Sequence, residues 1–490
     1  MDINTYLKGK LKEKNLTLED LITRSGASKS TIYRVITGAQ KPSKTLEKKI
    51  ISILNLNYKE QQELLYHFSI SDVDDNIIKS REAVYNLLFN KETNSPQKIE
   101  LVYYDEEKYV RTFDNILDKV IDASKRSNFT CQFKVINCIQ NDVIHPLAKA
   151  ATSLLANTNQ YTIEHLINFS THDYKENIKT LANILPLLTL ENYSLKYREE
   201  ENVSKQGFFH DFMAINYSYH KSDGSREVVN LYITILPNNL SACYVVKENQ
   251  ENTLDFFERN YNALQEQYQP ALNSRSCFLE YMNTAKELHG NYDSTLFKAQ
   301  IPLIRIPAKI HCSVVERTPM EEFFTFYFPE QPQEISLKNH IDELLKEAKL
   351  VEKTTYSNKQ LDIYTKAGLA QFASTGRLID HLKFMPPYNK SEIKSILKSL
   401  KTRDKNPKDP FNFLILEESY ASENLTFLTG DNHCLIIEKY DAGITPFCIF
   451  QHERLSAIFT DFAYNYIPAM MSIPQKEAHD YIDDLIDEYC

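Results

Sequence analysis

Apolar residues recur at intervals of three and four over the first ninety residues of the chain. Leu7 and Leu11 are four residues apart, and Leu18, Leu21 and Ile22 repeat that spacing shortly afterwards. Such intervals place apolar side chains on one face of a helix and leave the other face polar. The pattern predicts helices that begin near residues 4, 18, 29, 58 and 72.

Beyond residue 98 the spacing of apolar residues is no longer that of helices alone, because segments with the spacing of strands appear as well. Two segments alternate strictly between apolar and other residues, which is typical of strands with one buried face. Their apolar positions are Phe129, Cys131, Phe133 and Val135 in the first, and Val229, Leu231, Ile233 and Ile235 in the second. Helical spacing returns in segments that include residues 110–121, 335–350, 390–400 and 475–489. Strands and helices in alternation predict a mixed α/β body.

Polar residues and glycines mark the ends of the second and third helices. Thr17, followed three residues later by Asp20, resembles a capping box, and Ser28 is a suitable N-cap for the third helix. Gly26 lies between them, where a tight turn favours a residue that adopts a left-handed backbone. Gly38 follows the third helix, as expected of a C-cap. These features predict two short helices joined by a sharp turn.

The segment LTLEDLITRSGASKSTIYRVITG at residues 16–38 resembles the helix-turn-helix of the Cro/repressor-like (XRE) class of bacterial DNA-binding domains. The resemblance implies that the third helix enters the major groove of DNA. The implied DNA-binding residues are Thr17, Ser28, Lys29, Ser30, Tyr33, Arg34, Lys41, Ser43 and Lys44. The sequence departs from the family at Leu18, where many members carry a glutamine that contacts phosphate.

The distribution of charge agrees with this resemblance. The first 58 residues contain eleven Lys or Arg and five Asp or Glu, a net charge of +6, although the whole chain has a net charge of −10. A basic head on an acidic body suits contact with phosphates by the head alone.

The patterns divide the chain into four parts. We expect an all-α helix-turn-helix head at 1–57, a helical connector at 58–97, and α/β domains at 98–272 and 273–490. The last boundary follows a helical segment that ends near residue 265. The 490 residues are enough for two to four domains.

Several kinds of chemistry lack their sequence signatures. The ten glycines form neither GxGxxG nor GxxxxGK[ST], so no phosphate-binding loop is predicted. The eight cysteines contain no CxxC pair, and the histidines lack metal-ligand spacing. His145 and His165 adjoin apolar residues and are expected to be hydrogen-bonded core residues. We therefore expect no cofactor, no metal site and no catalytic residues. The absence of a long apolar run predicts no membrane span and a cytoplasmic location.

These observations favour a sequence-specific transcriptional regulator with an effector-sensing or oligomerising body, and not an enzyme. The expected partners are an inverted-repeat operator in double-stranded DNA, a second copy of the chain, and a small-molecule or peptide effector. The helices at 58–89 are expected to pair in the dimer, since Ile77, Ile78, Val84, Leu87 and Leu88 exceed the apolar content a linker needs. Two alternatives remain open: a peptide-pheromone receptor with a helical-repeat body, and an enzyme with a DNA-targeting head.

Overall fold

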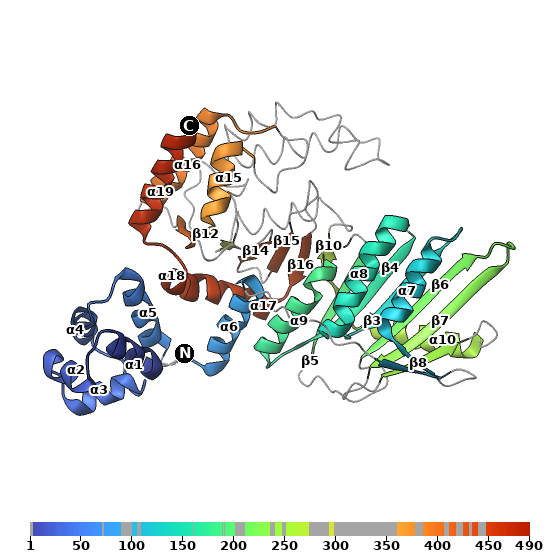
Figure 1. Ribbon diagram of the computed structural model, residues 1–490, viewed down its shortest axis with the longest axis horizontal. Helices are drawn as coiled ribbons and strands as arrows, with labels where there is room; N and C mark the ends of the chain where they lie inside the picture. The colour runs from blue at the N-terminus through green and yellow to red at the C-terminus, as the bar shows by residue number, and fades with distance from the viewer. Residues whose placement is uncertain are drawn as a thin grey trace.

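The computed structural model describes most of the chain in segments. They are residues 3–70, 73–89, 100–104, 109–158, 160–188, 190, 192–200, 211–235, 241–246, 251–273, 294–297, 360–377, 386–405, 411–417, 425–430, 434–439 and 447–490. The helix predicted at 335–350 lies outside these residues. Figure 1 shows a small helical unit at the N-terminus beside a larger body that contains the sheets.

Five helices form the N-terminal unit: α1 (Ile3–Glu13), α2 (Leu18–Ser25), α3 (Lys29–Ile36), α4 (Lys44–Leu54) and α5 (Tyr58–Ser69). One cluster of apolar side chains joins them, and it includes Leu7, Leu21, Ile32 and Ile50 at essentially zero exposure. Leu64 of α5 is buried in the same cluster. Helix α5 therefore packs with the first four helices, across the boundary expected at residue 58.

Helix α6 (Asp75–Phe89) leads from this unit into the body. It was expected to begin at Asp72, which lies outside the described residues. Instead, Asp74 precedes the first turn, where its carboxylate accepts a hydrogen bond from the Asn76 amide. The apolar face of α6 is covered within the chain: Val84 and Leu88 are buried in the body's core. The expectation that this face pairs between two copies of the chain is therefore wrong for these two residues.

In the part of the body that the structure describes, nine strands form a mixed sheet in the order β2-β1-β8-β7-β6-β3-β4-β5-β9. Its strands are β1 (Glu100–Tyr104), β2 (Tyr109–Thr112), β3 (Thr130–Ile136), β4 (Tyr161–Ser170), β5 (Tyr193–Glu200), β6 (Phe212–His220), β7 (Arg226–Ile235), β8 (Ser241–Val246) and β9 (Gln269–Pro270). Strands β3 and β7 confirm the two strands predicted from alternation, but β7 is not buried on one face alone, since Asn230, Tyr232 and Thr234 of its other face are also buried. Pairs β3–β4 and β4–β5 are parallel, whereas β3–β6 and β6–β7 are antiparallel.

Helices cover both faces of this sheet. The helices α7 (Phe113–Ser124), α8 (Asn141–Asn157) and α9 (Tyr174–Leu188) contribute to one apolar cluster with inward residues of β3 and β4. Helix α10 (Glu251–Gln265) covers the other face through Tyr261, which packs near Ile136 and Phe212. The helix predicted from Val110 begins three residues later because Val110 belongs to β2 and Thr112 caps α7.

A second sheet has seven strands within the described residues, in the order β10-β16-β15-β14-β11-β12-β13. Its strands are β10 (Leu272–Asn273), β11 (Ser294–Phe297), β12 (Gln360–Tyr364), β13 (Phe411–Ile415), β14 (Leu425–Gly430), β15 (Cys434–Lys439) and β16 (Phe447–Gln451). Helices α15 (Lys366–Thr375), α16 (Lys390–Asp404) and α19 (Gln475–Tyr489) share a core cluster with β12 and β13. The helices expected near 390 and 475 are thereby confirmed.

The chain passes from the first sheet to the second between Pro270 and Leu272. The two sheets nevertheless pack against each other, because Phe169 of β4 and Phe450 of β16 belong to one apolar cluster. Their rings are 6.1 Å apart between centroids. The body is thus mixed α/β, as predicted, and its strands contradict the all-helical body that a helical-repeat peptide receptor requires.

The helical unit contacts the C-terminal part of the body through a polar and aromatic junction. Arg81 of α6 donates two hydrogen bonds to the Asp461 carboxylate, at 2.7 and 2.9 Å, and a third to the Tyr66 hydroxyl at 3.3 Å. The Tyr66 ring meets the Tyr466 ring edge-on at 5.4 Å. Asp461 ends α17 (Glu453–Asp461), and Tyr466 ends the π-helix Phe462–Tyr466, which α18 (Ile467–Met470) follows. Figure 1 shows α5 beside α18.

Candidate nucleic-acid interface

Local hydrogen bonds position the ends of α2 and α3. The Thr17 hydroxyl accepts a hydrogen bond from the Asp20 amide at 3.1 Å, and the Asp20 carboxylate accepts one from the Thr17 amide at 2.8 Å. This capping box confirms the prediction from sequence. The Thr17 hydroxyl also donates a hydrogen bond of 2.6 Å to the Asp20 carboxylate. This bond, and after it the bond from the Thr17 amide, lowers the pKa of Asp20.

Gly26 makes the turn between the two helices. Its φ of +66° is in the left-handed region, and its amide donates to the Ile22 carbonyl at 3.2 Å. Two residues later, the Ser28 hydroxyl accepts from the Thr31 amide at 3.1 Å and begins α3. Gly38 also has a left-handed φ, of +73°, just after α3. Sequence reasoning predicted both the turn and its residues.

Helix α3 has one buried and one exposed face. Ile32, Val35 and Ile36 are buried, whereas Tyr33 is 45% exposed. All nine residues named as DNA-binding are exposed. They come from the N-cap of α2, from α3 with its N-cap, and from the segment that leads into α4. Figure 1 places α2 and α3 on the side of the helical unit away from the body.

The exposed cations on α3 differ in their surroundings. Lys29 forms an ion pair of 2.9 Å with Glu19 of α2, which raises the pKa of the lysine. Its ammonium also lies 6.0 Å from the centre of the Tyr33 ring. Arg34 has no ion-pair partner among the residues that the structure describes. The Lys29–Glu19 pair was not predicted, since an interaction across ten residues depends on how the two helices cross.

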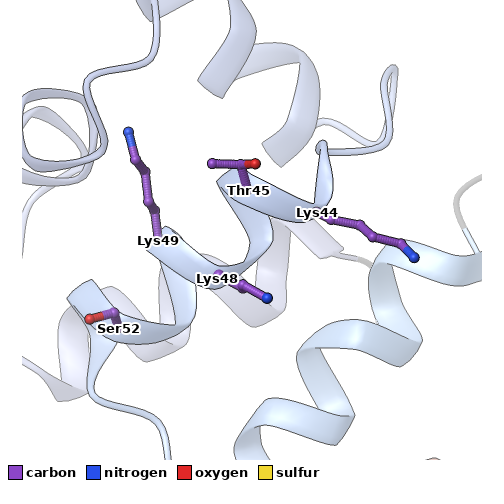
Figure 2. Close-up of a pocket in the computed structure, with 5 residues that line it drawn as sticks. All are labelled: Lys44, Thr45, Lys48, Lys49 and Ser52. Carbon is purple, nitrogen blue, oxygen red and sulfur yellow. The ribbon is translucent and has the colours of Figure 1, made fainter.

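Helix α4 contributes a basic surface of which the sequence analysis named only the first residues. The Ser43 hydroxyl accepts from the Leu46 amide at 3.3 Å and caps the helix. An open surface hollow of about 310 Å³ lies along its exposed face, lined by Lys44, Thr45, Lys48, Lys49 and Ser52. Figure 2 shows these five side chains. The signal in the sequence was the spacing of Lys44, Lys48 and Ser52, four residues apart and out of phase with the buried Leu46 and Ile50.

Outside the helical unit, His165 and Gly376 have structural roles. His165 is buried; its Nδ1 accepts a hydrogen bond from the Tyr193 hydroxyl at 2.9 Å, and its Nε2 donates to the Asn137 carbonyl. This confirms the expectation for His165, whereas His145 is exposed on α8, contrary to prediction. Gly376 ends α15 with a φ of +64°. Burial raises the pKa of Cys131, which keeps that thiol protonated.

Neither a metal centre nor a membrane helix is found in the described part of the chain. No three His, Cys, Asp or Glu side chains there are grouped as metal ligands. None of the described helices combines the length and apolar character needed to cross a bilayer.

No family model and no curated protein matches the chain. Among solved structures, the chain is similar to a phosphatidylserine synthase from Haemophilus influenzae Rd KW20. The identity is 10%, the match covers 84% of this chain and 91% of the synthase, and the TM-score is 0.19.

The function expected for the whole chain is corrected on the extent of the resemblance. The interpretation of all 490 residues as a transcriptional regulator with an effector-sensing or oligomerising body is withdrawn, because it extended a resemblance of about 55 residues to the entire chain. At a TM-score of 0.19, neither the fold nor the activity of the synthase is transferred to this protein.

Proposed function

We propose that the N-terminal helical unit is a helix-turn-helix module of the XRE type that binds double-stranded DNA. The proposal concerns this unit and assigns no activity to the body. The observation that carries it is the α2–Gly26–α3 arrangement, in which capped helices enclose a left-handed turn and α3 exposes its polar face. A cytoplasmic location, where DNA is accessible, is part of the proposal.

Arg34 is the residue best suited to read a base. Its guanidinium is exposed and has no carboxylate partner among the described residues, so DNA binding would not require an internal ion pair to break. A planar guanidinium can donate two hydrogen bonds to O6 and N7 of guanine. Lys29, in contrast, must exchange Glu19 for a phosphate or a base.

The capped helix ends support contact with the DNA backbone. The first amides of a helix point outward at its N-terminus and attract phosphate. The N-cap residues of α2 and α4, Thr17 and Ser43, are both exposed. Lys41 and Lys44 add positive charge on either side of Ser43. Such contacts fix the position of a protein on DNA without reading its sequence.

A second copy of the chain belongs to the proposal, because one such module covers only a short site. The pairing surface must differ from the buried face of α6, since Val84 and Leu88 pack inside the chain. Ile77 remains 39% exposed at the start of that helix. A small-molecule or peptide effector stays an expectation from the sequence.

The test is DNA binding by the full-length chain to a duplex enriched from a random pool. Arg34→Ala should weaken binding to the enriched duplex by about 1–3 kcal/mol, because one bidentate base contact is lost. Arg24→Ala is the matched control: it removes the same charge from α2, where Arg24 is also exposed. Fluorescence anisotropy measures both affinities.

Two results would contradict the proposal. The first is a wild-type chain that enriches no duplex and binds none at low salt. The second is equal affinity of wild type and Arg34→Ala for the enriched duplex, which would remove α3 from the interface.

A further inference from the structure

His452 lies at the junction of the two sheets, between β16 and α17. Its ring meets the Phe169 ring of β4 edge-on, at 5.1 Å between centroids, and stacks on the Tyr197 ring of β5 at 6.0 Å. The side chain of His452 is fully buried. Two rings of the first sheet therefore hold an imidazole that the second sheet supplies.

One nitrogen of this imidazole has partners and the other has none. The Leu455 amide donates a hydrogen bond of 3.4 Å to Nδ1, and Glu199 Oε1 lies 3.4 Å from the same nitrogen. Burial lowers the pKa of His452, although Glu199 acts in the opposite direction. A neutral ring that accepts at Nδ1 carries its proton on Nε2. Nε2 is buried without a hydrogen-bond partner among the described residues, so it is a donor that lacks an acceptor.

Arg454, in the first turn of α17, has a second donor of this kind. Its Nη1 is buried and has no hydrogen-bond partner in the described part of the chain. The guanidinium lies 5.9 Å from the centre of the Tyr174 ring of α9. None of the described carboxylates forms an ion pair with it. A buried guanidinium without a carboxylate is destabilising, and a bound anion would remove that penalty.

The first sheet supplies a third unpartnered group. The hydroxyl oxygen of Thr171 is buried, and no described residue forms a hydrogen bond with it. Thr171 follows β4 directly, between Phe169, which contacts His452, and Tyr174, which contacts Arg454. Figure 1 shows α17 beside α9. Thr171 thus belongs to the same part of the junction as the two donors.

The chemistry of these groups favours an anion. A guanidinium nitrogen and the protonated Nε2 only donate, and a hydroxyl can also donate. Native proteins leave few buried polar groups unpaired, so three in one region call for a partner. The N-terminus of α17 adds the positive end of the helix dipole. The Glu199 carboxylate lies at Nδ1 and is 37% exposed, so solvent weakens its repulsion of an anion at Nε2. A cation, in contrast, would be repelled by Arg454.

We propose that His452, Arg454 and Thr171 bind the carboxylate or phosphate group of a small ligand at the junction of the two sheets. His452 Nε2 and Arg454 Nη1 donate to the oxygens of this group, and the Thr171 hydroxyl adds a contact from the first sheet. Boundaries between structural units are a common place for small ligands. The site is in the body, so it does not depend on DNA binding by the helical unit.

Binding of inorganic phosphate and of acetate to the full-length chain tests the proposal and distinguishes the two kinds of oxyanion. Isothermal titration calorimetry at constant ionic strength should show binding of at least one of them to the wild type. Arg454→Met removes the guanidinium and keeps an apolar stem. His452→Asn keeps an N-cap acceptor for the Leu455 amide and removes the Nε2 donor. Each variant should weaken binding about 10- to 100-fold, as expected for one hydrogen bond to a charged group.

The control is Arg126→Met, which changes an exposed arginine just after α7 and should bind as the wild type does. Urea unfolding without added anion gives a second measurement. Arg454→Met should leave the chain at least as stable as the wild type, because it removes a charge that has no partner.

Three results would overturn the proposal. The first is a wild-type chain that binds neither phosphate nor acetate. The second is equal affinity of the wild type, Arg454→Met and His452→Asn for the anion that binds. The third is a marked loss of stability in Arg454→Met without anion, which would show that the guanidinium already has a partner within the chain.

Discussion

At the scale of single residues, the burial of His165 makes the stability of the folded chain sensitive to pH. Burial lowers the pKa of His165 to about 4, although the hydrogen bond to the Asn137 carbonyl acts in the opposite direction. In the unfolded chain the pKa is about 6.5. Between these values the unfolded state binds more protons than the folded state, so the free energy of unfolding rises with pH.

We therefore expect the folded chain to lose stability as the pH falls below about 6.5. For a single group with these pKa values, the loss between pH 7.5 and pH 5 is about 2 kcal/mol. His165→Gln should flatten this part of the pH profile in urea unfolding. His145→Gln changes an exposed histidine of α8 and should leave the profile as it is. A profile equally steep in both variants would assign the effect to other groups.

At the scale of elements, two glycines with nearly the same backbone conformation meet different surroundings. Gly26 and Gly376 have φ values of +66° and +64°. A Cβ on Gly26 would find the Lys49 ammonium as its nearest neighbour, at 3.8 Å. A Cβ on Gly376 would lie 2.2 Å from the carbonyl oxygen of Tyr388. A Cβ therefore has room at Gly26 but would clash with the backbone at Gly376.

Gly26→Ala should consequently cost only the strain of a left-handed backbone, about 1–2 kcal/mol. Gly376→Ala should cost more, because the backbone at Tyr388 must also move, and the Gly376–Tyr388 hydrogen bond of 2.7 Å would be disturbed. Urea unfolding of the full chain measures both changes. Equal costs for the two variants would show that conformational strain alone governs both positions.

Helix α6 shows what the spacing of apolar residues along a chain cannot predict. The apolar positions of α6 predicted pairing with a second copy of the chain, whereas Val84 and Leu88 join the body's core within one chain. Periodicity indicates that a face is buried, but it does not distinguish burial within one chain from burial between two.

At the scale of the whole molecule, the Arg81–Asp461 pair connects α6 to the C-terminal part of the body. The side chain of Arg81 is 6% exposed and that of Asp461 is 30% exposed. Loss of one partner leaves the other charge uncompensated, and the penalty is larger for the more buried charge. The two substitutions should thus have unequal effects.

Asp461→Ala should lower the free energy of unfolding by about 3–5 kcal/mol, because it leaves a buried guanidinium without its carboxylate. Arg81→Met should cost less, since it keeps the apolar stem and leaves a partly hydrated carboxylate. Asp255→Ala is the control: it breaks the exposed Asp255–Arg259 pair on α10 and should change stability by about 0.5 kcal/mol or less. Urea unfolding compares the three, and a smaller loss for Asp461→Ala than for Arg81→Met would contradict this account.

The sequence by itself determined the local features of this protein. The helix caps and the turn were predicted from Thr17, Gly26 and Ser28. Capping hydrogen bonds join residues only a few positions apart, and a left-handed φ belongs to a single residue. The alternation at Phe129–Val135 and Val229–Ile235 likewise predicted strands. In each case the interaction that fixes the structure spans a short stretch of chain.

The tertiary structure decided every feature that joins distant residues. The pairing of Lys29 with Glu19, the hydrogen bond from Lys49 to the Ser25 carbonyl at the end of α2, and the Arg81–Asp461 junction all depend on how helices cross. The shared core of the two sheets depends on which strand faces meet. Periodicity specifies which face of an element is apolar, and only packing in three dimensions specifies what covers it.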